Sequence, residues 1–357
     1  MKIAVYTIAL NEAQFVARWA ETAAPADCRV VADTGSTDGT IEKLRAAGVE
    51  VHSISINPWR FDHARNTALA LVPGDVDICV SLDMDEVIQP GWREALLAAW
   101  KPGTTRVRNP LEIHIGADGV ARSHFNSSRI HQRFGYSWKY PIHELIVPAA
   151  HITEQTAYTD QLRIRHLPDD NKSRGQYLPM LAAAAAEAPD DDRLAHYYGR
   201  ELMFRHRYEE AIVELRRHLG LPRATWKAER AASMRFIGRC HKSLGRLAEA
   251  RGAYLQACAE TPDAREPWHD LAKLCMDGKD WAGGIWAAQR ALAIDVMPRD
   301  HTRDAKAWGI GPYDIGSICA YYAGQHELAR EWLTKALAFE PDNARLIKNS
   351  SWIFAQK

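Results

Sequence analysis

The chain has 357 residues, of which 46% are apolar and 25% are charged, a composition typical of globular proteins with a hydrophobic core. Its 45 Lys and Arg residues equal its 45 Asp and Glu residues, so net charge provides no long-range attraction to nucleic acid or to an anionic membrane. No apolar run approaches the roughly 18–20 residues that a helix needs to cross a bilayer. The length allows two or three domains of ordinary size.

The apolar start of the chain, residues 1–10, is interpreted as a buried strand and not as a signal peptide. It is short, and it runs directly into Asn11 and Glu12. The six cysteines form no C-x-x-C pair, and most of them lie among apolar residues. We therefore expect reduced core cysteines and a cytoplasmic location, with no disulfide or metal framework built on cysteine.

Strand and helix patterns alternate through the first hundred or so residues. The predicted strands are 2–8, 28–32, 49–54 and 76–82, and the predicted helices are 12–24, 37–46 and 61–71. Such alternation favours a mainly parallel sheet covered on both faces. Ligands of these sheets bind beyond the carboxyl ends of the strands, which is where Asn11, Asp33 and Asp83 occur.

The pattern changes between residues 104 and 166. Short β-like segments, separated by turns, replace the helices; they are 106–115, 120–125, 130–134, 142–147 and 162–166. We interpret this stretch as the mixed second half of the same domain, where an acceptor site would be built.

From about residue 172 onward the sequence is almost entirely helical in pattern. Small residues recur at Ala211, Ala250, Gly284 and Ala329, and in three of the four cases a bulky residue follows four positions later, at Leu215, Tyr254 and Leu333. One interval equals the ~34-residue period of tetratricopeptide repeats, and the others need insertions, of which residues 297–311 are the longest candidate. The segment resembles degenerate tetratricopeptide repeats, with an ordinary helical bundle as the alternative. Stacked repeats offer a face to a peptide or to another subunit, so a homodimer through the repeats is one expectation.

The sharpest motif is the run S-L-D-M-D-E at residues 81–86, directly after a predicted strand. Three carboxylates within four residues repel one another unless they are solvated or neutralised by a cation. In a D-x-D turn one aspartate can reach a metal while the other accepts a hydrogen bond from a sugar hydroxyl. Hard oxygen ligands suit Mg²⁺ or Mn²⁺, so the motif predicts a divalent-metal site.

A second polar turn follows the second strand. Asp33 stands at the strand tip, where its carboxylate could accept from a nucleobase N–H, and Gly35 permits a tight backbone turn. The following residues, 36–40, are interpreted largely as a helix cap, and Asp38 as a structural residue.

Four motifs therefore occur in order within the first hundred residues: N-E at 11–12, D-T-G-S-T-D-G-T at 33–40, W-x-F-x-x-A-R-N at 59–66 and D-M-D-E at 83–86. Together they resemble the family 2 glycosyltransferases of the GT-A fold. The resemblance implies an α/β, Rossmann-like GT-A domain and a nucleoside-diphosphate sugar donor, most commonly UDP-linked. It also implies Mn²⁺ or Mg²⁺, and inversion at the anomeric carbon.

The resemblance also implies roles for individual positions. Asp33 would contact the nucleobase, Asp83 the ribose or sugar, and Asp85 the metal, while Arg65 would approach the diphosphate. The further donor-site candidates in these motifs are Thr7, Ala9, Asn11, Glu12 and Asn66.

Two later segments resemble the branch of this family that carries C-terminal repeats. They are Y-P-I-H-E-L at 140–145 and I-R-H at 164–166, the second followed by Lys172 and Arg174. His166 would then join Asp85 and Asp83 in the metal shell, and Lys172 and Arg174 would close over the diphosphate. For His143 and His166, a hydrogen-bonded structural role is the alternative.

The acceptor side has weaker candidates. Glu144 is the predicted catalytic base, because it is an acid in the acceptor half beside His143; Glu112 and Asp118 are the fallbacks. Trp59 lies nearest the motifs and is the best candidate to stack on a sugar, with His143 beside the acceptor.

We therefore expect a metal-dependent hexosyltransferase with a GT-A domain over residues 1–171, a linker helix over 172–190 and a repeat domain over 191–357. The acceptor stays open among a peptide or protein, a surface glycan and a modified nucleobase in DNA. A catalytically inactive GT-A domain that serves as a scaffold for a protein partner is the main alternative. A nucleotidyltransferase is disfavoured, because residues 7–12 lack the glycine and lysine of a phosphate loop.

Overall fold

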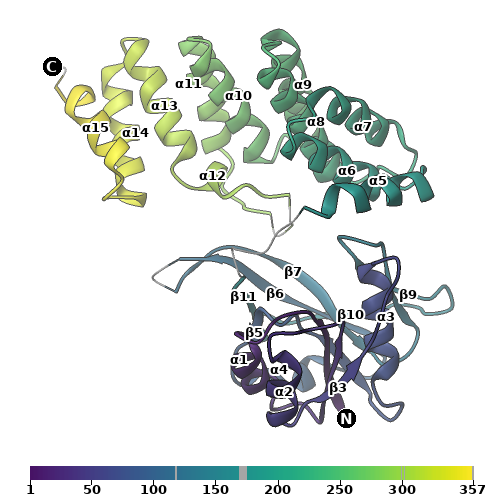
Figure 1. The fold of residues 1–357 in the computed structure, drawn as a ribbon. Helices are drawn as coiled ribbons and strands as arrows, with labels where there is room; N and C mark the ends of the chain where they lie inside the picture. The colour runs from purple at the N-terminus through teal and green to yellow at the C-terminus, as the bar shows by residue number, and fades with distance from the viewer. Residues whose placement is uncertain (117–118, 169–174, 299, 301, 356–357) are drawn as a thin grey trace. The chain divides into compact units, whose positions relative to one another are not determined.

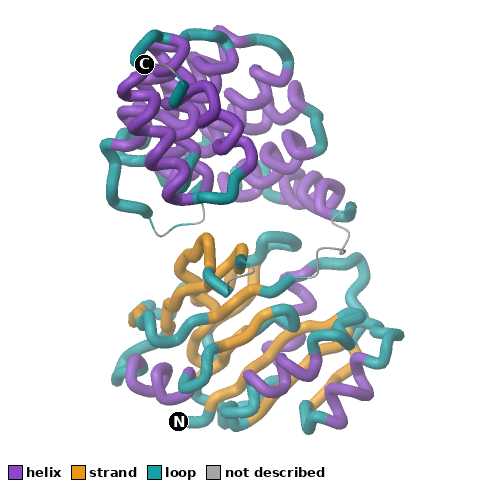
Figure 2. Tube along the Cα trace, turned by 90° about the vertical axis from the view of Figure 1, so that its left-hand side faces the viewer, coloured by secondary structure: helices purple, strands orange, loops and turns teal. Residues whose placement is uncertain are grey.

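The computed structural model describes residues 1–116, 119–168, 175–298, 300 and 302–355, with the side chains of residues 122 and 123 excepted. The chain divides into two compact units, Met1–Gln176 and Tyr177–Lys357. The described strands all belong to the first unit, and the second is built of helices (Figure 2).

Four parallel strands form one side of the first unit's sheet. In spatial order they are β3 (Glu50–Ser53), β2 (Cys28–Asp33), β1 (Ile3–Ala9) and β4 (Ile78–Ser81). Successive residues of β1 point to opposite faces, so Ile3 and Val5 join one apolar cluster while Ala4 and Tyr6 join another. Both faces of this strand are therefore buried, as its almost continuous apolar sequence predicts.

Four helices cover this parallel part of the sheet. They are α1 (Val16–Thr22), α2 (Thr40–Ala46), α3 (Phe61–Leu71) and α4 (Trp92–Ala99). Trp19, Leu44 and Trp92 place α1, α2 and α4 against one face. Ala68 and Leu69 of α3 pack on the other, which brings the first turns of α3 toward the ends of the central strands.

Beyond β4 the sheet becomes mixed. It continues through β7 (Ala121–Gln132), β6 (Arg106–Ile115), β11 (Ile164–His166) and β5 (Glu86–Ile88), while β10 (Thr156–Tyr158) pairs with β6. A separate two-stranded sheet joins β8 (Tyr136–Lys139) to β9 (Leu145–Pro148). The chain thus leaves the central strand β4 and reaches the edge strand β5 through residues 82–85, the turn that carries the D-x-D motif.

The second unit consists of helices arranged mainly in antiparallel pairs along the chain (Figure 1). They are α5 (Tyr177–Glu187), α6 (Asp192–Phe204), α7 (Tyr208–Gly220), α8 (Lys227–Ser243), α9 (Leu247–Glu260), α10 (Arg265–Asp277), α11 (Trp281–Leu292), α12 (Ala305–Trp308), α13 (Gly311–Tyr322), α14 (His326–Phe339) and α15 (Ala344–Ile353).

Small residues let the two helices of a pair approach closely. A Cβ atom added to a glycine of the first helix would clash with a bulky side chain of the second in three of the pairs. The facing residues are Gly199 with Leu215, Gly238 with Tyr254, and Gly316 with Trp332. These pairs confirm the predicted fold class, an α/β domain followed by tetratricopeptide-like repeats. None of the helices in the described ranges combines the length and the apolar character that a bilayer crossing requires.

Candidate functional site

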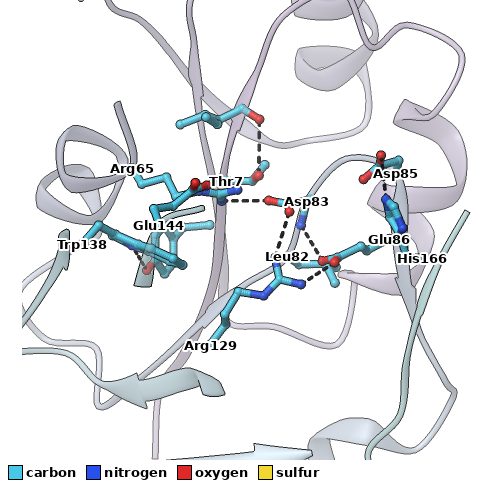
Figure 3. Close-up of polar contacts among 12 residues, drawn as sticks. Thr7, Arg65, Leu82, Asp83, Asp85, Glu86, Arg129, Trp138, Glu144 and His166 are labelled. Atoms are coloured by element: carbon cyan, nitrogen blue, oxygen red, sulfur yellow. Dashed lines mark hydrogen bonds and ion pairs between the residues drawn. The ribbon is translucent and has the colours of Figure 1, made fainter. Parts of the chain in front are cut away.

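A chain of ion pairs lies at the carboxyl end of β4 and is centred on Asp83 (Figure 3). Arg65 of α3 donates from Nη1 to Asp83 Oδ1 at 2.7 Å and from Nε to Glu144 Oε1 at 2.5 Å. Arg129 of β7 donates from Nη1 to Asp83 Oδ2 at 2.8 Å, and its Nη2 pairs with Glu86. Three carboxylates and two guanidinium groups therefore alternate across the site.

Local backbone contacts place Glu144 beside Arg65. The amide of Phe61, at the start of α3, donates to Pro141 O at 3.0 Å. Asn66 exchanges two hydrogen bonds of 2.8 Å with the backbone of Trp138 in β8, and the Arg65 guanidinium stacks 4.9 Å from the centre of the Trp138 ring. Asn66, expected at the donor, thus fastens α3 to β8 and fixes where Arg65 points.

Burial and charge act in opposite directions on Asp83. Burial by itself would raise the pKa of this carboxyl group, but the guanidinium groups of Arg65 and Arg129 outweigh it and hold the pKa well below its ordinary value. Glu86 is more deeply buried and shares Arg129 with Asp83, so burial prevails and its pKa is raised. The chain of ion pairs therefore keeps the partly buried Asp83 ionised.

Three uncharged side chains, Tyr6, His131 and Trp138, form a hydrogen-bonded cluster next to the ion pairs. Trp138 Nε1 donates to the Tyr6 hydroxyl at 2.9 Å, and that hydroxyl lies 3.1 Å from His131 Nε2. Burial lowers the pKa of His131 to about 4. A neutral imidazole must donate from Nδ1 to reach the Gln132 carbonyl at 2.7 Å, so Nε2 accepts from Tyr6.

Asp85 and His166 form a second polar pair, with 3.2 Å between Asp85 Oδ2 and His166 Nε2. Two backbone features bring them together: the antiparallel pairing of β5 with β11, and a hydrogen bond of 2.8 Å from Leu167 N to Asp85 O. The hydrogen bond to Asp85 raises the pKa of His166 above its ordinary value. Met84, between the two aspartates, is buried in the core beneath the turn.

The Asp85–His166 pair offers two ligands of the kind that divalent cations bind, one carboxylate and one imidazole. A carboxylate and an imidazole are common metal ligands, and Mg²⁺ sites often use one or two protein ligands with substrate phosphates and waters. No cluster of three or more His, Cys, Asp or Glu side chains able to hold a metal occurs among the described residues. Both Asp83 oxygens are bound by guanidinium groups. Asp85 and His166 are therefore the two protein ligands that fit, and Asp83 has no oxygen left while its ion pairs last.

The turn after β2 is held together by its own side chains. Asp33 Oδ1 accepts from the amides of Gly35 and Ser36 at 2.9 Å each, and its other oxygen accepts from the Ser36 hydroxyl. Asn11 ties the end of β1 to this turn, because its amide donates to Ser36 Oγ and its Oδ1 accepts from Thr37 N, both at 2.8 Å. Asp33 is completely buried, so its carboxylate shapes the turn and not an open surface.

Residues 5–145 match the family model described as Glycosyl transferase family 2. The match lies within the first unit, Met1–Gln176, and spans most of it. No curated protein matches the chain.

The solved structures that resemble this chain cover its helical half. MamA is 16% identical and covers 47% of this chain and 83% of its own, with a TM-score of 0.37. PilW, described as a widely conserved type IV pilus biogenesis factor, is 17% identical, with 48% and 72% covered and a TM-score of 0.40. PilF of Pseudomonas aeruginosa is 14% identical, with 48% and 72% covered and a TM-score of 0.39.

The remaining predicted residues of the family 2 domain lie around these groups. Thr7 and Ala9 are buried in β1, and the amide of Glu12 donates to Thr40 Oγ1 at 2.8 Å. Trp59 is half-buried and packs edge-to-face on Phe61, with ring centres 5.2 Å apart. These contacts link Glu12 to the turn after β2 and Trp59 to the start of α3.

The acceptor-side predictions fall in three places. His143 precedes Glu144 in a loop where its φ is 53°, a left-handed conformation that turns the chain sharply. Glu112 of β6 is buried and is held by Arg165 at 2.7 Å and by Arg163 at 3.2 Å. Asp118, Lys172 and Arg174 lie outside the described residues.

Arg129 was missed by the sequence reasoning, and Glu86 was quoted in the motif without a role. Arg129 fell between two predicted strands, 120–125 and 130–134, that form the single strand β7. The signal that could have found it is a cation inside a β-rich run, because a partly buried arginine needs a carboxylate partner. Asp83 is 46 positions away in sequence, so only the antiparallel pairing of β4 with β7 brings the two together.

Replacing Arg129 should destabilise the family 2 domain. Arg129→Met leaves the buried Glu86 without its guanidinium partner and Asp83 with Arg65 alone, so we expect a loss of about 3–5 kcal/mol in the free energy of unfolding. The matched control, Arg163→Met, removes a half-exposed guanidinium from Glu112 while Arg165 stays, and should cost only about 0–1 kcal/mol. Urea denaturation followed by tryptophan fluorescence measures both. Equal losses would show that Arg129 has no special electrostatic role.

The Asp85–His166 pair should titrate visibly. In metal-free protein we expect the NMR titration midpoint of His166 above the ordinary value of about 6.5, and Asp85→Asn should lower it. Because the pKa is raised in the folded state, the pair adds stability below the ordinary His pKa and loses it as pH rises through the raised value. A midpoint that does not move in Asp85→Asn would contradict this assignment.

Proposed function

We propose that the family 2 domain transfers a sugar from a nucleoside-diphosphate sugar, UDP-linked in the first instance, to an acceptor with inversion at the anomeric carbon. The observation that carries the proposal is the Asp85–His166 pair beside two arginines at the end of β4, within the segment that matches the family. The arrangement supplies both cation ligands and guanidinium groups for a diphosphate.

Arg65 and Arg129 are proposed to serve the diphosphate. Guanidinium groups bind phosphate through paired N–H donors, and both arginines are oriented by the carboxylate of Asp83. A diphosphate entering this site would share these donors with Asp83, so little side-chain rearrangement is needed. In this proposal Asp83 positions the arginines, and it reaches the ribose or sugar only when donor binding frees one of its oxygens.

The cation is proposed to rest on Asp85 and His166. When bound, it would offset the charge that develops on the leaving diphosphate. His166 must be neutral to act as a ligand, and its hydrogen bond to Asp85 orients the ring in advance. Leu167 N holds the Asp85 backbone, so both ligands start from strands that pair with each other.

The nucleoside is proposed to lie against the turn after β2. Asp33 and Asn11 make this turn rigid through their hydrogen bonds. Recognition of the base would then come from the groups that the turn exposes, with Asp33 acting through the shape of the turn. Trp59, at the start of α3, remains the proposed stacking residue for the sugar, with Lys172 and Arg174 proposed to close on the diphosphate.

Glu144 is proposed as the base that removes the acceptor proton. Its Oε1 is held by Arg65, which leaves Oε2 as the proposed proton acceptor and fixes its direction. His143 precedes it in the same loop and would lie on the acceptor side. The repeats of the second unit are proposed to favour a protein or peptide acceptor over a glycan or a nucleobase, and a homodimer through them stays a proposal.

A donor screen tests the proposal as a whole. Ligand binding to the folded state raises the melting temperature, so a nucleoside-diphosphate sugar with Mn²⁺ should stabilise the protein, and at least one donor should be slowly hydrolysed. Asp85→Asn should remove the Mn²⁺-dependent part of the stabilisation, whereas Asp38→Asn, in a turn-forming residue, should leave that part in place. A panel in which no donor stabilises or is hydrolysed would favour the inactive scaffold.

Glu144→Gln should separate chemistry from binding. Loss of a general base lowers the transfer rate by about 10²–10⁴-fold, while donor affinity measured by calorimetry should stay within a few-fold, because Gln can still accept from Arg65. Glu112→Gln is the matched control, since Glu112 is also held by arginines. If Glu112→Gln loses transfer and Glu144→Gln retains it, Glu144 is not the base.

A further inference from the structure

The connector between α11 and α13 binds back onto the repeats. Residues 293–310 separate these helices, and they include the four-residue helix α12. Figure 1 shows α12 beside the ends of α10 and α13, and both helices contact it. This connector coincides with the insertion that the irregular repeat spacing predicts.

Two side chains of the connector fasten it to the first helices of two neighbouring pairs. The Asp304 carboxylate lies 3.2 Å from Arg239 Nη2 and 3.6 Å from Arg235 Nη2, both on α8. Four residues later, Trp308 Nε1 donates to Glu266 Oε1 of α10 at 2.7 Å.

Two further contacts hold the connector against α10. The amide of Asp304 donates to the same Glu266 oxygen at 3.1 Å, and the Arg265 guanidinium stacks 4.5 Å from the centre of the Trp308 ring. Glu266 therefore receives both ends of the segment 304–308.

The receiving face also has ion pairs of its own between α8 and α10. Arg235 is buried and donates to Asp270 Oδ2 at 2.7 Å, and Arg239, one helical turn further along α8, lies 3.1 Å from Asp270 Oδ1. Two guanidinium groups thus share one carboxylate of α10, which leaves one positive charge to be neutralised. Asp304 neutralises it, and the two arginines hold the pKa of Asp304 below its ordinary value against the effect of burial.

The contacts of Asp304 and Trp308 could be replaced by the same contacts from another protein segment. The side chains of Arg239 and Asp304 are 33% and 29% exposed, and ion pairs open to water contribute little to stability. Covalent attachment adds to these contacts, because a short tether gives the segment an effective concentration of about millimolar order. A partner segment with the same two groups could therefore replace it.

We propose that the face of α8 and α10 made by Arg235, Arg239, Arg265 and Glu266 is a binding site for a protein segment. The segment carries a carboxylate and, four residues later, a tryptophan, and residues 304–308 of the chain occupy this site in cis. The partner class follows from the occupant: Asp304 shows which group the arginines receive, and Trp308 shows what lies between Arg265 and Glu266. The site is separate from the sugar-transfer chemistry, and its test needs no donor.

The experiment uses the full chain and a fluorescent synthetic peptide with the sequence of residues 302–310. In the variant Asp304→Ala/Trp308→Ala the site is vacated, so peptide binding measured by anisotropy should be at least tenfold tighter than to the unchanged protein. A peptide with both Asp and Trp replaced by Ala should bind at least tenfold more weakly. Adding Arg239→Ala to the vacated variant should abolish binding, and its circular dichroism should match that of the parent.

Three results would overturn the proposal. The first is a folded vacated variant that binds the peptide no better than the unchanged protein. The second is equal binding of the peptide that lacks Asp and Trp. The third is unchanged protein that forms dimers by exchanging its intact connector, because a second copy would then be the occupant.

A second measurement covers the case in which the vacated variant fails to fold. The unchanged protein is incubated with the peptide at several millimolar, above the effective concentration of the connector, and amide hydrogen exchange of residues 302–310 is followed. Displacement should accelerate exchange there at least tenfold, while α9 serves as the internal reference. Unchanged exchange at saturating peptide would overturn the proposal.

Discussion

The candidate site of this protein depends on one carboxylate that two arginines share. Asp83 stands where the central strand β4 ends, and it receives Arg65 from α3 and Arg129 from β7. Isolated in the interior, either cation or the anion would be costly, because charge removed from water needs a partner. Their mutual neutralisation lets a helix and a strand meet at the sheet edge with charged groups still in place. Glu144 forms a second ion pair with Arg65, and Glu86 forms a second ion pair with Arg129.

The aromatic and amide groups behind the ion pairs make the arrangement stiff. The Arg65 guanidinium stacks on the Trp138 ring. Trp138 also donates from its backbone amide to Asn66 Oδ1 and from its ring Nε1 to the Tyr6 hydroxyl. One residue of β8 therefore connects α3, β1 and the ion pairs. A preorganised site of this kind spends little free energy on reorientation when charge develops in it.

The sequence predicted the parallel half of the sheet well, because β1 and β4 are almost entirely buried and their sequences are almost continuous apolar runs. The helix expected at residues 61–71 has those limits in the structure. The mixed half was predicted less well. Polar residues such as His124 and Asn126 hide the continuity of β7, and pairing with β6 over most of its length supplies the stability that its sequence does not reveal. Helix α4, which packs through Trp92 and Leu96, was not predicted either.

In the candidate site, too, motifs within a few residues were predicted better than contacts between residues far apart in sequence. Motifs within a few residues, such as the turn after β2 or the D-x-D turn, were recognisable from spacing alone. The pairing of Arg129 with Asp83 joins residues 46 positions apart and was not predicted. Asp85 and His166, which are 81 positions apart, were placed together only through the family resemblance. Asp33 illustrates the converse: its position was predicted, but its oxygens serve the turn. In the repeats, Gly199 and Gly238 gained meaning only from the bulky side chains that face them.

Met84 gives the D-x-D turn a property that its two acidic neighbours do not convey. With its side chain inserted in the core, the turn is pinned at its middle, while Asp83 points to the arginines and Asp85 to His166. The two carboxylates are thus attached on either side of one buried residue. A change of volume at position 84 would shift the turn that carries both carboxylates, so this apolar residue helps to set the spacing between the arginine pair and the imidazole.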